Sequence, residues 1–486
     1  MILSFLFLLA CGPQKQEPSS TELSSPSRSH ITKPEALPKK NFTPPSLQTA
    51  QLSNKLPVFL QENHEVPLVR VWISFEAGSW TDPDDLIGLS DITMDMLDEG
   101  SKDLTGASLS SQLRNLGSNL QISNQPDGSI IEVQALKQNL APTLSLLNTV
   151  LMHPLFPEDV WVRKKAQYLQ SLAQQHNDAK SISRNVWNKL LYKDQYMGRL
   201  QTQNHINSIS TKNMRDWYDQ FIVPQTTKIW VGGATTLTEV KPMLEEYFGS
   251  WTKVPSKKLP STPSEISLKE PPRSFIYLID KPGATQSVIR IGHGIGHERA
   301  PETTALNVAN NAIGGMFTAR INQFLREEKG WTYGAWTWLS HNYYPGSFNM
   351  SSSVVTEHTA DSIREVIRIL RSSKGDTPIT QTEVDRAKGD LMGTFPMKFE
   401  KPDFAIHNQL RIMRYQLPED WISGYEQRVN TITLEDAQTA WNENIDPETI
   451  YILIVGDKNA IESSLLTLGY PIIPMNTYGE KIKTDK

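Results

Sequence analysis

The sequence of 486 residues contains one cysteine, Cys11, which excludes a disulfide framework and a cysteine-based metal site. It has little excess of either charge, since 48 basic and 53 acidic residues give a formal net charge of −5. No basic surface is therefore predicted that would favour nucleic acid as a partner. Beyond the N-terminus, no segment approaches the roughly 20 apolar residues that span a bilayer. What is left is a globular protein long enough for two or three domains.

The apolar run from Ile2 to Ala10 ends at Cys11, in the sequence Leu-Leu-Ala-Cys. This pattern resembles a bacterial lipoprotein signal, in which cleavage leaves the cysteine as the lipidated first residue. We predict a signal peptide over residues 1–11, lipidation at Cys11 and a location in the cell envelope, facing the periplasm. Gly12 after the cysteine favours the outer membrane by analogy with lipoprotein sorting. No basic residue precedes the run, which indicates either a true start upstream of Met1 or an atypical signal. A buried N-terminal strand with a chance cysteine is the alternative.

Two segments rich in Pro, Ser and Lys divide the rest of the chain. Residues 12–47 contain few large apolar side chains, so the burial of these side chains could not offset the entropy cost of ordering the segment. We therefore predict a disordered tether. Residues 253–271 form the second segment and are predicted to link two domains of nearly equal length. We place the N-terminal domain at 48–252, the C-terminal domain at 272–476 and a short tail at 477–486.

The two domains resemble copies of each other at a constant offset of 223 positions. Residues 224–226, Pro-Gln-Thr, correspond to Pro-Glu-Thr at 447–449, and the apolar residues 229–233 correspond to 452–456. The same offset relates Arg163 to Arg386 and Lys165 to Lys388. One offset that holds over this length indicates a gene duplication.

Both periodicities of secondary structure occur in each half. Residues 68–75 and 287–291 are rich in β-branched side chains and are predicted to be strands. Residues 211–221 and 236–248 place apolar side chains on one face at helical spacing. Strands and helices interleave without a tight βαβ rhythm, which predicts an α+β fold of two homologous domains, each a mostly antiparallel sheet with flanking helices.

One pair of segments is more specific. Residues 314–320 read Gly-Gly-Met-Phe-Thr-Ala-Arg, and residues 325–333 read Leu-Arg-Glu-Glu-Lys-Gly-Trp-Thr-Tyr. Together they resemble the C-terminal-half signature of the insulinase/pitrilysin (M16) family of zinc peptidases. The resemblance covers about residues 50–475 and extends to residues 78–79, 88–89 and 156–158. It implies the fold of the mitochondrial processing peptidase, with two homologous α+β domains closing half of a clam-shell chamber.

The resembled family binds zinc through His-x-x-Glu-His on a first-half helix, together with a distant glutamate. Two His at i and i+4 share one helix face, and the Glu between them activates the zinc-bound water. The matching positions here are Asp91, Met94 and Asp95, and the third-ligand position falls near Ser171. Methionine can neither take a proton nor polarise water, so no metal or other cofactor is expected in this chain.

The acidic positions have an alternative reading. Asp91 and Asp95, with Asp98 and Glu99, could hold a hard cation, but a solvated acidic helix face is the interpretation we favour. His293 and His297 are four residues apart in a glycine-rich stretch that continues a predicted strand. On a strand this spacing is roughly 13 Å, too far for two His to share one ion. The His64-Glu65 pair lacks a second His at helical spacing and is predicted to be a surface turn.

The signature of the second half is intact. Phe317, Ile321, Phe324 and Leu325 fit one face of a helix that Gly330 would terminate. The resemblance implies that Arg326 and Tyr333 reach the zinc site of the other half or of a partner chain. There they would hold the substrate backbone and stabilise the developing oxyanion.

Simpler roles exist for the same residues. Arg326 could pair with Glu327 or Glu328, and Tyr333 could pack in the core. For the aromatic stretch from Trp331 to Trp338, sheet core is favoured over a substrate wall.

The preferred functional hypothesis is therefore a non-catalytic, substrate-binding subunit of a two-chain zinc peptidase. It would donate Arg326 and Tyr333 to a zinc-bearing partner of the same family and enclose a peptide substrate. Zinc is expected in the partner, and membrane contact only through the lipid anchor. The alternatives are a structural or scaffolding envelope protein, and a self-sufficient hydrolase that uses an unrecognised site.

Overall fold

Strands and helices interleave along the whole chain in the computed structural model. The structure describes residues 42–260, 268, 271, 273–298, 300–340, 346–400 and 402–482. The predicted signal peptide, Cys11 and most of the predicted tether lie outside these residues. Residues Thr43–Lys486 form one compact unit. Within the described ranges, every helix is too short or too polar to cross a membrane.

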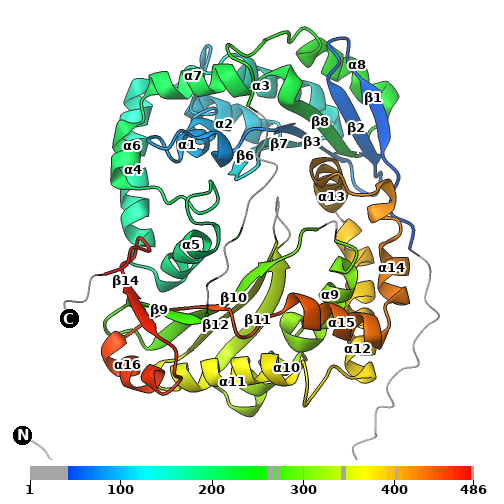
Figure 1. The fold of residues 1–486 in the computed structure, drawn as a ribbon. Helices are drawn as coiled ribbons and strands as arrows, with labels where there is room; N and C mark the ends of the chain where they lie inside the picture. The colour runs from blue at the N-terminus through cyan, green and yellow to red at the C-terminus, as the bar shows by residue number, and fades with distance from the viewer. Residues whose placement is uncertain are drawn as a thin grey trace, which may run out of the picture. The chain divides into compact units, whose positions relative to one another are not determined.

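The first half is built on a six-stranded sheet with the order β1-β2-β8-β3-β7-β6 (Figure 1). Its strands are β1 (Gln48–Gln51), β2 (Pro57–Glu62), β3 (Leu68–Phe75), β6 (Asn119–Gln125), β7 (Gly128–Leu136) and β8 (Thr227–Gly233). All neighbouring strands are antiparallel except β2 and β8, which run parallel. The short strands β4 (Gly100–Ser101) and β5 (Leu104–Thr105) form a separate pair.

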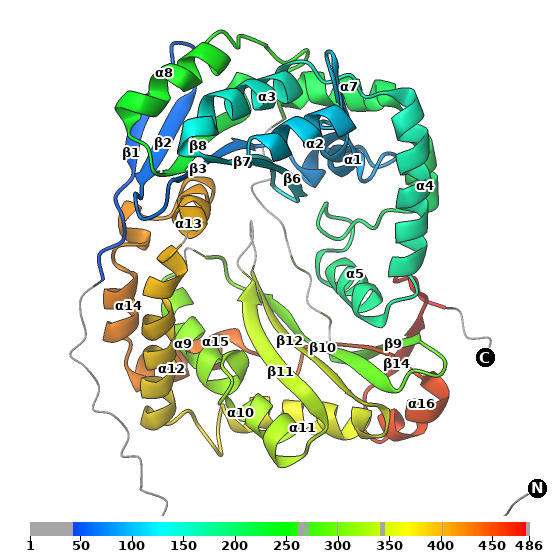
Figure 2. The same cartoon turned by 180° about the vertical axis from the view of Figure 1, so that it is seen from behind.

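The second half has its own six-stranded sheet with the order β11-β12-β10-β13-β9-β14, seen from its β11 side in Figure 2. Its strands are β9 (Phe275–Asp280), β10 (Gln286–Ile295), β11 (Thr332–Ser340), β12 (Gly346–Val355), β13 (Tyr451–Gly456) and β14 (Ile472–Met475). Pairs β11·β12, β12·β10 and β10·β13 are antiparallel, and β9 runs parallel to both its neighbours. The prediction of an α+β fold with mostly antiparallel sheets is confirmed.

The two sheets share one topology over five strands. Strands β2, β8, β3, β7 and β6 correspond in order and direction to β9, β13, β10, β12 and β11, and only the sixth strands differ. The offset of 223 also reproduces a hydrogen bond. The ammonium of Lys165 donates to the carbonyl of Asn207 (3.3 Å), and that of Lys388 donates to the carbonyl of Asn430 (2.7 Å). Such agreement in strand order and contact is what an internal duplication produces.

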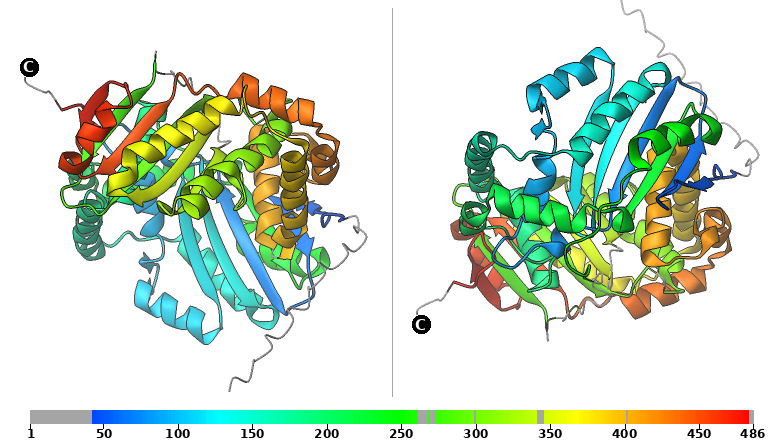
Figure 3. Two further views of the ribbon diagram at one scale, coloured as in Figure 1. Left: turned by 90° about the horizontal axis from the view of Figure 1, so that it is seen from below. Right: turned by 90° about the horizontal axis from the view of Figure 1, so that it is seen from above.

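Helices cover the outer face of each sheet (Figure 3). The first half contains α1 (Leu89–Asp95), α2 (Gly106–Asn115), α3 (Leu140–Met152), α4 (Glu158–Gln175), α6 (Gln203–Ser208), α7 (Thr211–Phe221) and α8 (Leu237–Phe248). The second half contains α9 (Thr303–Asn310), α10 (Arg320–Asn322), α11 (Thr359–Ser372), α12 (Gln381–Thr394), α14 (Tyr425–Thr431), α15 (Leu434–Asn444) and α16 (Lys458–Leu466). Two π-helical turns, η4 (Asn311–Gly315) and η5 (Gln323–Glu328), flank α10. Each set packs its apolar face on its own sheet to form one core.

The remaining two helices cross between the halves. Helix α5 (Ala179–Tyr192), from the first half, buries Ile182, Val186 and Trp187 against second-half strands. Helix α13 (Pro402–Tyr415), from the second half, buries Ile406 against Trp72 and Trp230 of the first sheet. Because each half contributes a helix to the other's sheet, the halves are interlocked and not simply joined by a linker.

Several boundaries of helices and strands agree closely with those predicted from the sequence, but the predicted position of one side chain does not. Strand β3 and helix α7 have the predicted bounds, and Thr236 caps α8 through its hydroxyl. Gly330, at φ +67°, follows η5 as the expected terminator. Ile321 and Leu325 are buried, but Phe317 precedes the helix and is 47% exposed, so its predicted place on the apolar face is wrong. The bounds of the two domains stay a prediction.

Candidate functional site

Helix α1 carries the positions that correspond to the zinc-binding segment of the resembled family. Its periodicity turns Met94 into the first-half core, where the side chain is 1% exposed, while Asp91 and Asp95 face outward. The position of the water-activating glutamate is therefore a packing position here. A thioether in the core supplies neither a base nor a metal ligand for this helix.

Helix α4 lies against the outward face of α1 and supplies cationic and phenolic partners. The Lys164 ammonium donates to Asp95 Oδ2 (2.7 Å) and forms an ion pair with Glu99 (2.9 Å). The Tyr168 hydroxyl donates to the same Asp95 oxygen (2.7 Å). Ser171 lies one turn further along α4 and is exposed. The face of α4 next to α1 thus presents the Lys164 ammonium and the Tyr168 hydroxyl to Asp95.

These contacts do not fit zinc. A zinc site needs converging His, Cys or carboxylate ligands, and across the ranges that the structure describes no group of three or more such side chains is placed to hold a metal ion. Lys164 instead brings a positive charge to the aspartates, and its side chain is only 12% exposed. These side chains therefore form ion pairs that connect the two helices.

Two aspartates beside these ion pairs have unusual acidity. Asp82 accepts hydrogen bonds from the backbone N–H of Gly88 and Ser90 (both 2.8 Å), which fixes the start of α1. Burial nevertheless raises the pKa of Asp82 to about 6. Burial also raises the pKa of Asp91 to about 6, and the charges of Asp95 and Asp82 add to the rise. Asp91 is partly open to solvent, but the surrounding protein still desolvates its carboxyl group.

We expect Asp91→Asn to stabilise the protein at pH 8 and to have little effect at pH 4. The raised pKa means that the folded state prefers the protonated acid, so wild-type stability is present below pH 4 and is lost as pH rises through about 6. After a discount for solvent screening, the gain at pH 8 is about 1 kcal/mol. Thermal unfolding at both pH values measures it. Asp95→Asn is the matched control, and it should lower the stability because it weakens the bonds to Lys164 and Tyr168. An equal gain in stability at both pH values for Asp91→Asn would contradict the prediction.

Arg326 lies in the π-helical turn η5, a distortion frequently found at functional sites. Its guanidinium lies over the ring of Phe317, with Cζ 4.5 Å from the centroid, and its Nε is 3.3 Å from a carboxylate oxygen of Glu327. The side chain is 36% exposed. The pairing with a neighbouring glutamate that the sequence left open is present, and both contacts are at the surface.

Tyr333 occupies the second position of β11 and is 89% exposed. The alternative in which it packs in the core is wrong. Within the described residues, β11 is an edge strand that pairs with β12, and a bulge falls between Thr332 and Ala335. The bulge re-aims the side chains of the strand where Tyr333 projects.

The aromatic stretch that contains Tyr333 is divided between core and surface. Trp331 is half-buried and stacks on His358 at 4.9 Å between ring centroids. Trp336 and Trp338 are 40% and 37% exposed. The favoured interpretation as sheet core is therefore wrong for these two, because Ala335 and Thr337 alternate with them and occupy the buried face.

His293 is a structural residue of β10. It is 1% exposed, its Nδ1 lies 2.6 Å from the carbonyl of Gly294, and its Nε2 accepts from the backbone N–H of Asp446 (3.1 Å). Burial lowers its pKa, which keeps the ring neutral. Both ring nitrogens of His293 are therefore used in contacts within the protein. His64 is exposed in the loop after β2, where a surface turn was predicted.

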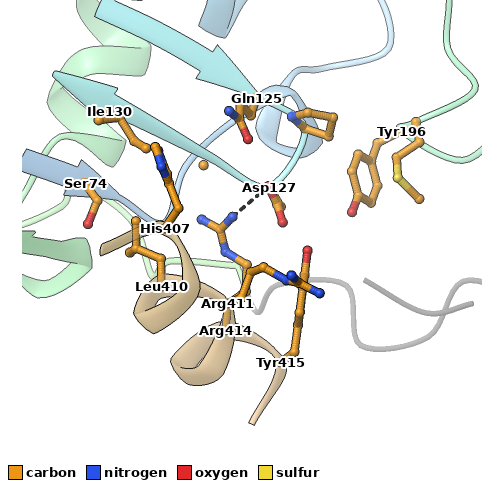
Figure 4. Close-up of a pocket in the computed structure, with 13 residues that line it drawn as sticks. Ser74, Gln125, Asp127, Ile130, Tyr196, His407, Leu410, Arg411, Arg414 and Tyr415 are labelled. Carbon is orange, nitrogen blue, oxygen red and sulfur yellow. Dashed lines mark ion pairs between the residues drawn. The ribbon is translucent and has the colours of Figure 1, made fainter. Parts of the chain in front are cut away.

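A cavity of about 280 Å³ lies where α13 meets the first sheet (Figure 4). Arg414 pairs with Asp127 across it at 2.8 Å, and both side chains are largely buried. The close-up shows Tyr196 and Tyr415 pointing toward the same space from opposite sides. Burial raises the pKa of both phenols, and the Asp127 charge adds to the rise.

The glycine at position 128 makes this contact possible, because an added Cβ would lie 2.7 Å from the carbonyl oxygen of Phe75 and would also meet the Arg414 guanidinium. The hydroxyl of Ser74, which lines the cavity, is used in bonds to Trp230 and Lys228. The cavity joins the halves and does not present a free hydroxyl nucleophile at Ser74. Sequence reasoning missed it, although His407, Arg411 and Arg414 share the i, i+4, i+7 face of one helix.

Comparison with known families decides the assignment. A model described as "Insulinase (Peptidase family M16)" matches residues 57–203, and one described as "Peptidase M16 inactive domain" matches residues 208–391. The chain belongs to peptidase family M16. The first model ends at residue 203 and the second begins at residue 208, before the predicted linker, and together they span strands β2 to β12.

Individual relatives are distant but align over most of their length. An uncharacterized zinc protease YmxG of Bacillus subtilis is 19% identical over 396 residues, 79% of this chain and 91% of that protein. The non-peptidase homolog YmxG of Helicobacter pylori is 20% identical over 424 residues, 83% and 92% of the two chains. A crystal structure of a peptidase M16 inactive domain from Pseudomonas fluorescens superposes with a TM-score of 0.74 at 20% identity, over 85% of this chain and 98% of that one. The M16 fold of two α+β domains is confirmed.

Membership in M16 relates the geometry of α1 to the zinc motif of the family. Helix α1, which carries the positions of the zinc motif, has Met94 in the core of the first half and Asp95 bonded to Lys164. Family membership and the missing ligands together support a non-catalytic role for the isolated M16 chain.

Proposed function

We propose that this M16 chain is the non-catalytic, peptide-binding subunit of a two-chain peptidase, and that its partner is a zinc-bearing chain of the same family. The observation that carries the proposal is Tyr333, which is 89% exposed at the bulge of β11. A phenol so exposed contributes nothing to the core, yet it is available to a group brought by another chain. The family signature around it is intact, while the metal positions are not.

Arg326 and Tyr333 would act as hydrogen-bond donors in the assembled active site. A guanidinium and a phenol can hold the substrate backbone and stabilise negative charge that develops on the carbonyl oxygen. The present contacts of Arg326 with Phe317 and Glu327 are at the surface, so exchanging them for a substrate costs little. Zinc would be held by the partner, because the residues of α1 do not fit it.

The proposed setting is the cell envelope. Lipidation at Cys11 and a tether over residues 12–47 would anchor the folded halves on the periplasmic side, with the outer membrane as the favoured location. The lipid would be the only membrane contact in this arrangement. An unfolded peptide enclosed between the two chains would be the substrate.

Reconstitution with the zinc-bearing partner tests the proposal. We expect the partner alone to cleave a fluorogenic unfolded peptide slowly, and stoichiometric addition of this chain to raise turnover by roughly 100-fold, the effect of an added oxyanion donor. The two chains should co-purify from native envelopes. Equal cleavage with and without this chain would reject the proposal and favour the scaffolding alternative.

A further inference from the structure

The solvent face of β11 carries three large aromatic side chains, and Phe317, which precedes α10, lies beside one of them. We call Phe317, Tyr333, Trp336 and Trp338 the aromatic strip; they are 47%, 89%, 40% and 37% exposed. Alternation along the strand sends the buried Ala335 and Thr337 to the core and the two indoles to the opposite face. Exposed aromatic residues that gather in this way mark interaction surfaces.

The local packing holds the strip together. The rings of Phe317 and Trp336 lie 6.4 Å apart between centroids. Gly334 leaves room for the second indole, since a Cβ added there would come within 2.8 Å of Trp336 Nε1. On the neighbouring strand, Trp336 lies opposite Ser351 and Trp338 opposite Asn349. The shorter side chains of β12 leave part of each indole open to solvent.

The outer edge of β11 is closed to an added strand beside the strip. The backbone N–H of Ala335 donates to Asn322 Oδ1 (3.0 Å), and the side-chain amide of Asn310 donates to the carbonyl of Thr337 (3.5 Å). Both main-chain groups would be needed to pair a peptide with this edge. A ligand at the strip must bind through its side chains on the face of the sheet.

Positive charge lies at both ends of the strip. The Arg326 guanidinium lies 4.5 Å from the centroid of Phe317, and the Arg290 guanidinium lies 5.9 Å from that of Trp338. Arg290 is held in place by a bond to Ser183 Oγ (2.8 Å). A ligand that matches this surface has an apolar centre and negative charge at its ends.

The spacing of the indoles indicates what that centre is. Side chains at i and i+2 on a strand repeat at roughly 7 Å, and the same-face side chains of any extended peptide have the same repeat. We propose that the aromatic strip binds an extended peptide with aromatic or bulky aliphatic residues at alternate positions, flanked by acidic residues. The inference rests on the proposed function, for which it names the class of peptide.

Binding to the isolated chain tests this inference without a partner. The probe is the fluorescein-labelled peptide Asp-Phe-Ser-Phe-Ser-Phe-Asp, with its termini blocked, measured by fluorescence anisotropy on the purified full chain. We expect the double substitution Trp336→Ala, Trp338→Ala to weaken binding by at least roughly 10-fold, since two aromatic anchors are removed. A probe with Lys for both Asp should bind more weakly to the wild type. Leu466→Ala, at a 65% exposed position of α16, is the control and should bind like the wild type.

A second variant keeps the indoles and changes only the charge. Ser351→Glu places a carboxylate opposite Trp336, and it should weaken the acidic probe more than a probe with Asn for both Asp. Equal binding of the acidic probe by wild type and both variants would overturn the inference. So would capture of chitohexaose in place of the peptide, since aromatic platforms also stack on sugars. Peptide binding with no activation of the partner would instead reject the proposed function alone.

Discussion

Arg326→Ala is expected to lower kcat/KM of the reconstituted two-chain peptidase by roughly 100-fold, the usual loss when one oxyanion donor is removed. The substitution takes away a guanidinium that is 36% exposed and contacts the ring of Phe317 and the Glu327 carboxylate. Because these are surface contacts, the unfolding midpoint of the isolated chain should move little. Steady-state kinetics of the complex, set beside thermal unfolding of the subunit, separate the two effects.

Two further variants sharpen this expectation. Tyr333→Phe removes only a hydroxyl from an 89% exposed side chain and should also lower turnover, with no loss of stability. Arg114→Ala, at an exposed arginine of α2 that bonds to Ser110, is the matched control and should leave kcat/KM unchanged. Unchanged turnover in Arg326→Ala would remove the proposed role of this residue.

Arg320→Ala is expected to destabilise the second half by about 3 kcal/mol, the lower end of the range for breaking a buried ion pair. The guanidinium binds both carboxylate oxygens of Glu383 at 2.6 Å and donates to the carbonyls of Thr377 (2.5 Å) and Pro378 (2.7 Å). Both charged side chains are about four-fifths buried. Removing the arginine leaves a carboxylate and two carbonyls without these donors, and the unfolding midpoint should fall by roughly 6–12 °C.

The pH dependence of this loss identifies its source. Burial alone would raise the pKa of Glu383, but the bonds from Arg320 and Thr380 outweigh it and hold the pKa below its ordinary value. A lowered folded-state pKa gives stability that is present above the ordinary pKa and lost as pH falls through the folded value. The destabilisation should therefore be full at pH 7 and shrink below pH 4. The pair Arg368–Glu365 on α11 (2.6 Å), in which the arginine side chain is 53% exposed, is the control. Arg368→Ala should cost less than about 1 kcal/mol.

Much of the fold could be predicted because its signals are local or repeated. The β-branched residues of β3 and the apolar face of α7 define these elements without help from the rest of the chain. The 223-residue offset gives the duplication, since equivalent positions must repeat the same contacts, as Lys165 and Lys388 do. Motif spacing also identified the family, because the segment from Gly314 to Tyr333 is contiguous in sequence.

The exchange of α5 and α13 between the halves could not be predicted. Both helices are amphipathic, and amphipathicity shows that a face is buried but not against which sheet. The same limit explains the aromatic stretch of β11. Alternation separates Trp336 and Trp338 from Ala335 and Thr337, but size alone favoured the core for the tryptophans, and the structure buries the small residues instead.

The sequence by itself determined that this chain is a duplicated M16 protein with Asp91 and Asp95 at the two histidine positions of the zinc motif and Met94 at the position of the catalytic glutamate. Residue identity alone decides that Met94 cannot activate water. Only the tertiary structure decided what replaced the metal site. Lys164 comes from a helix almost 70 residues further along the chain, and its bond to Asp95 exists only once α4 packs on α1. The same holds for Tyr333, since exposure depends on which neighbours the fold provides, and the fold leaves this phenol open to another chain.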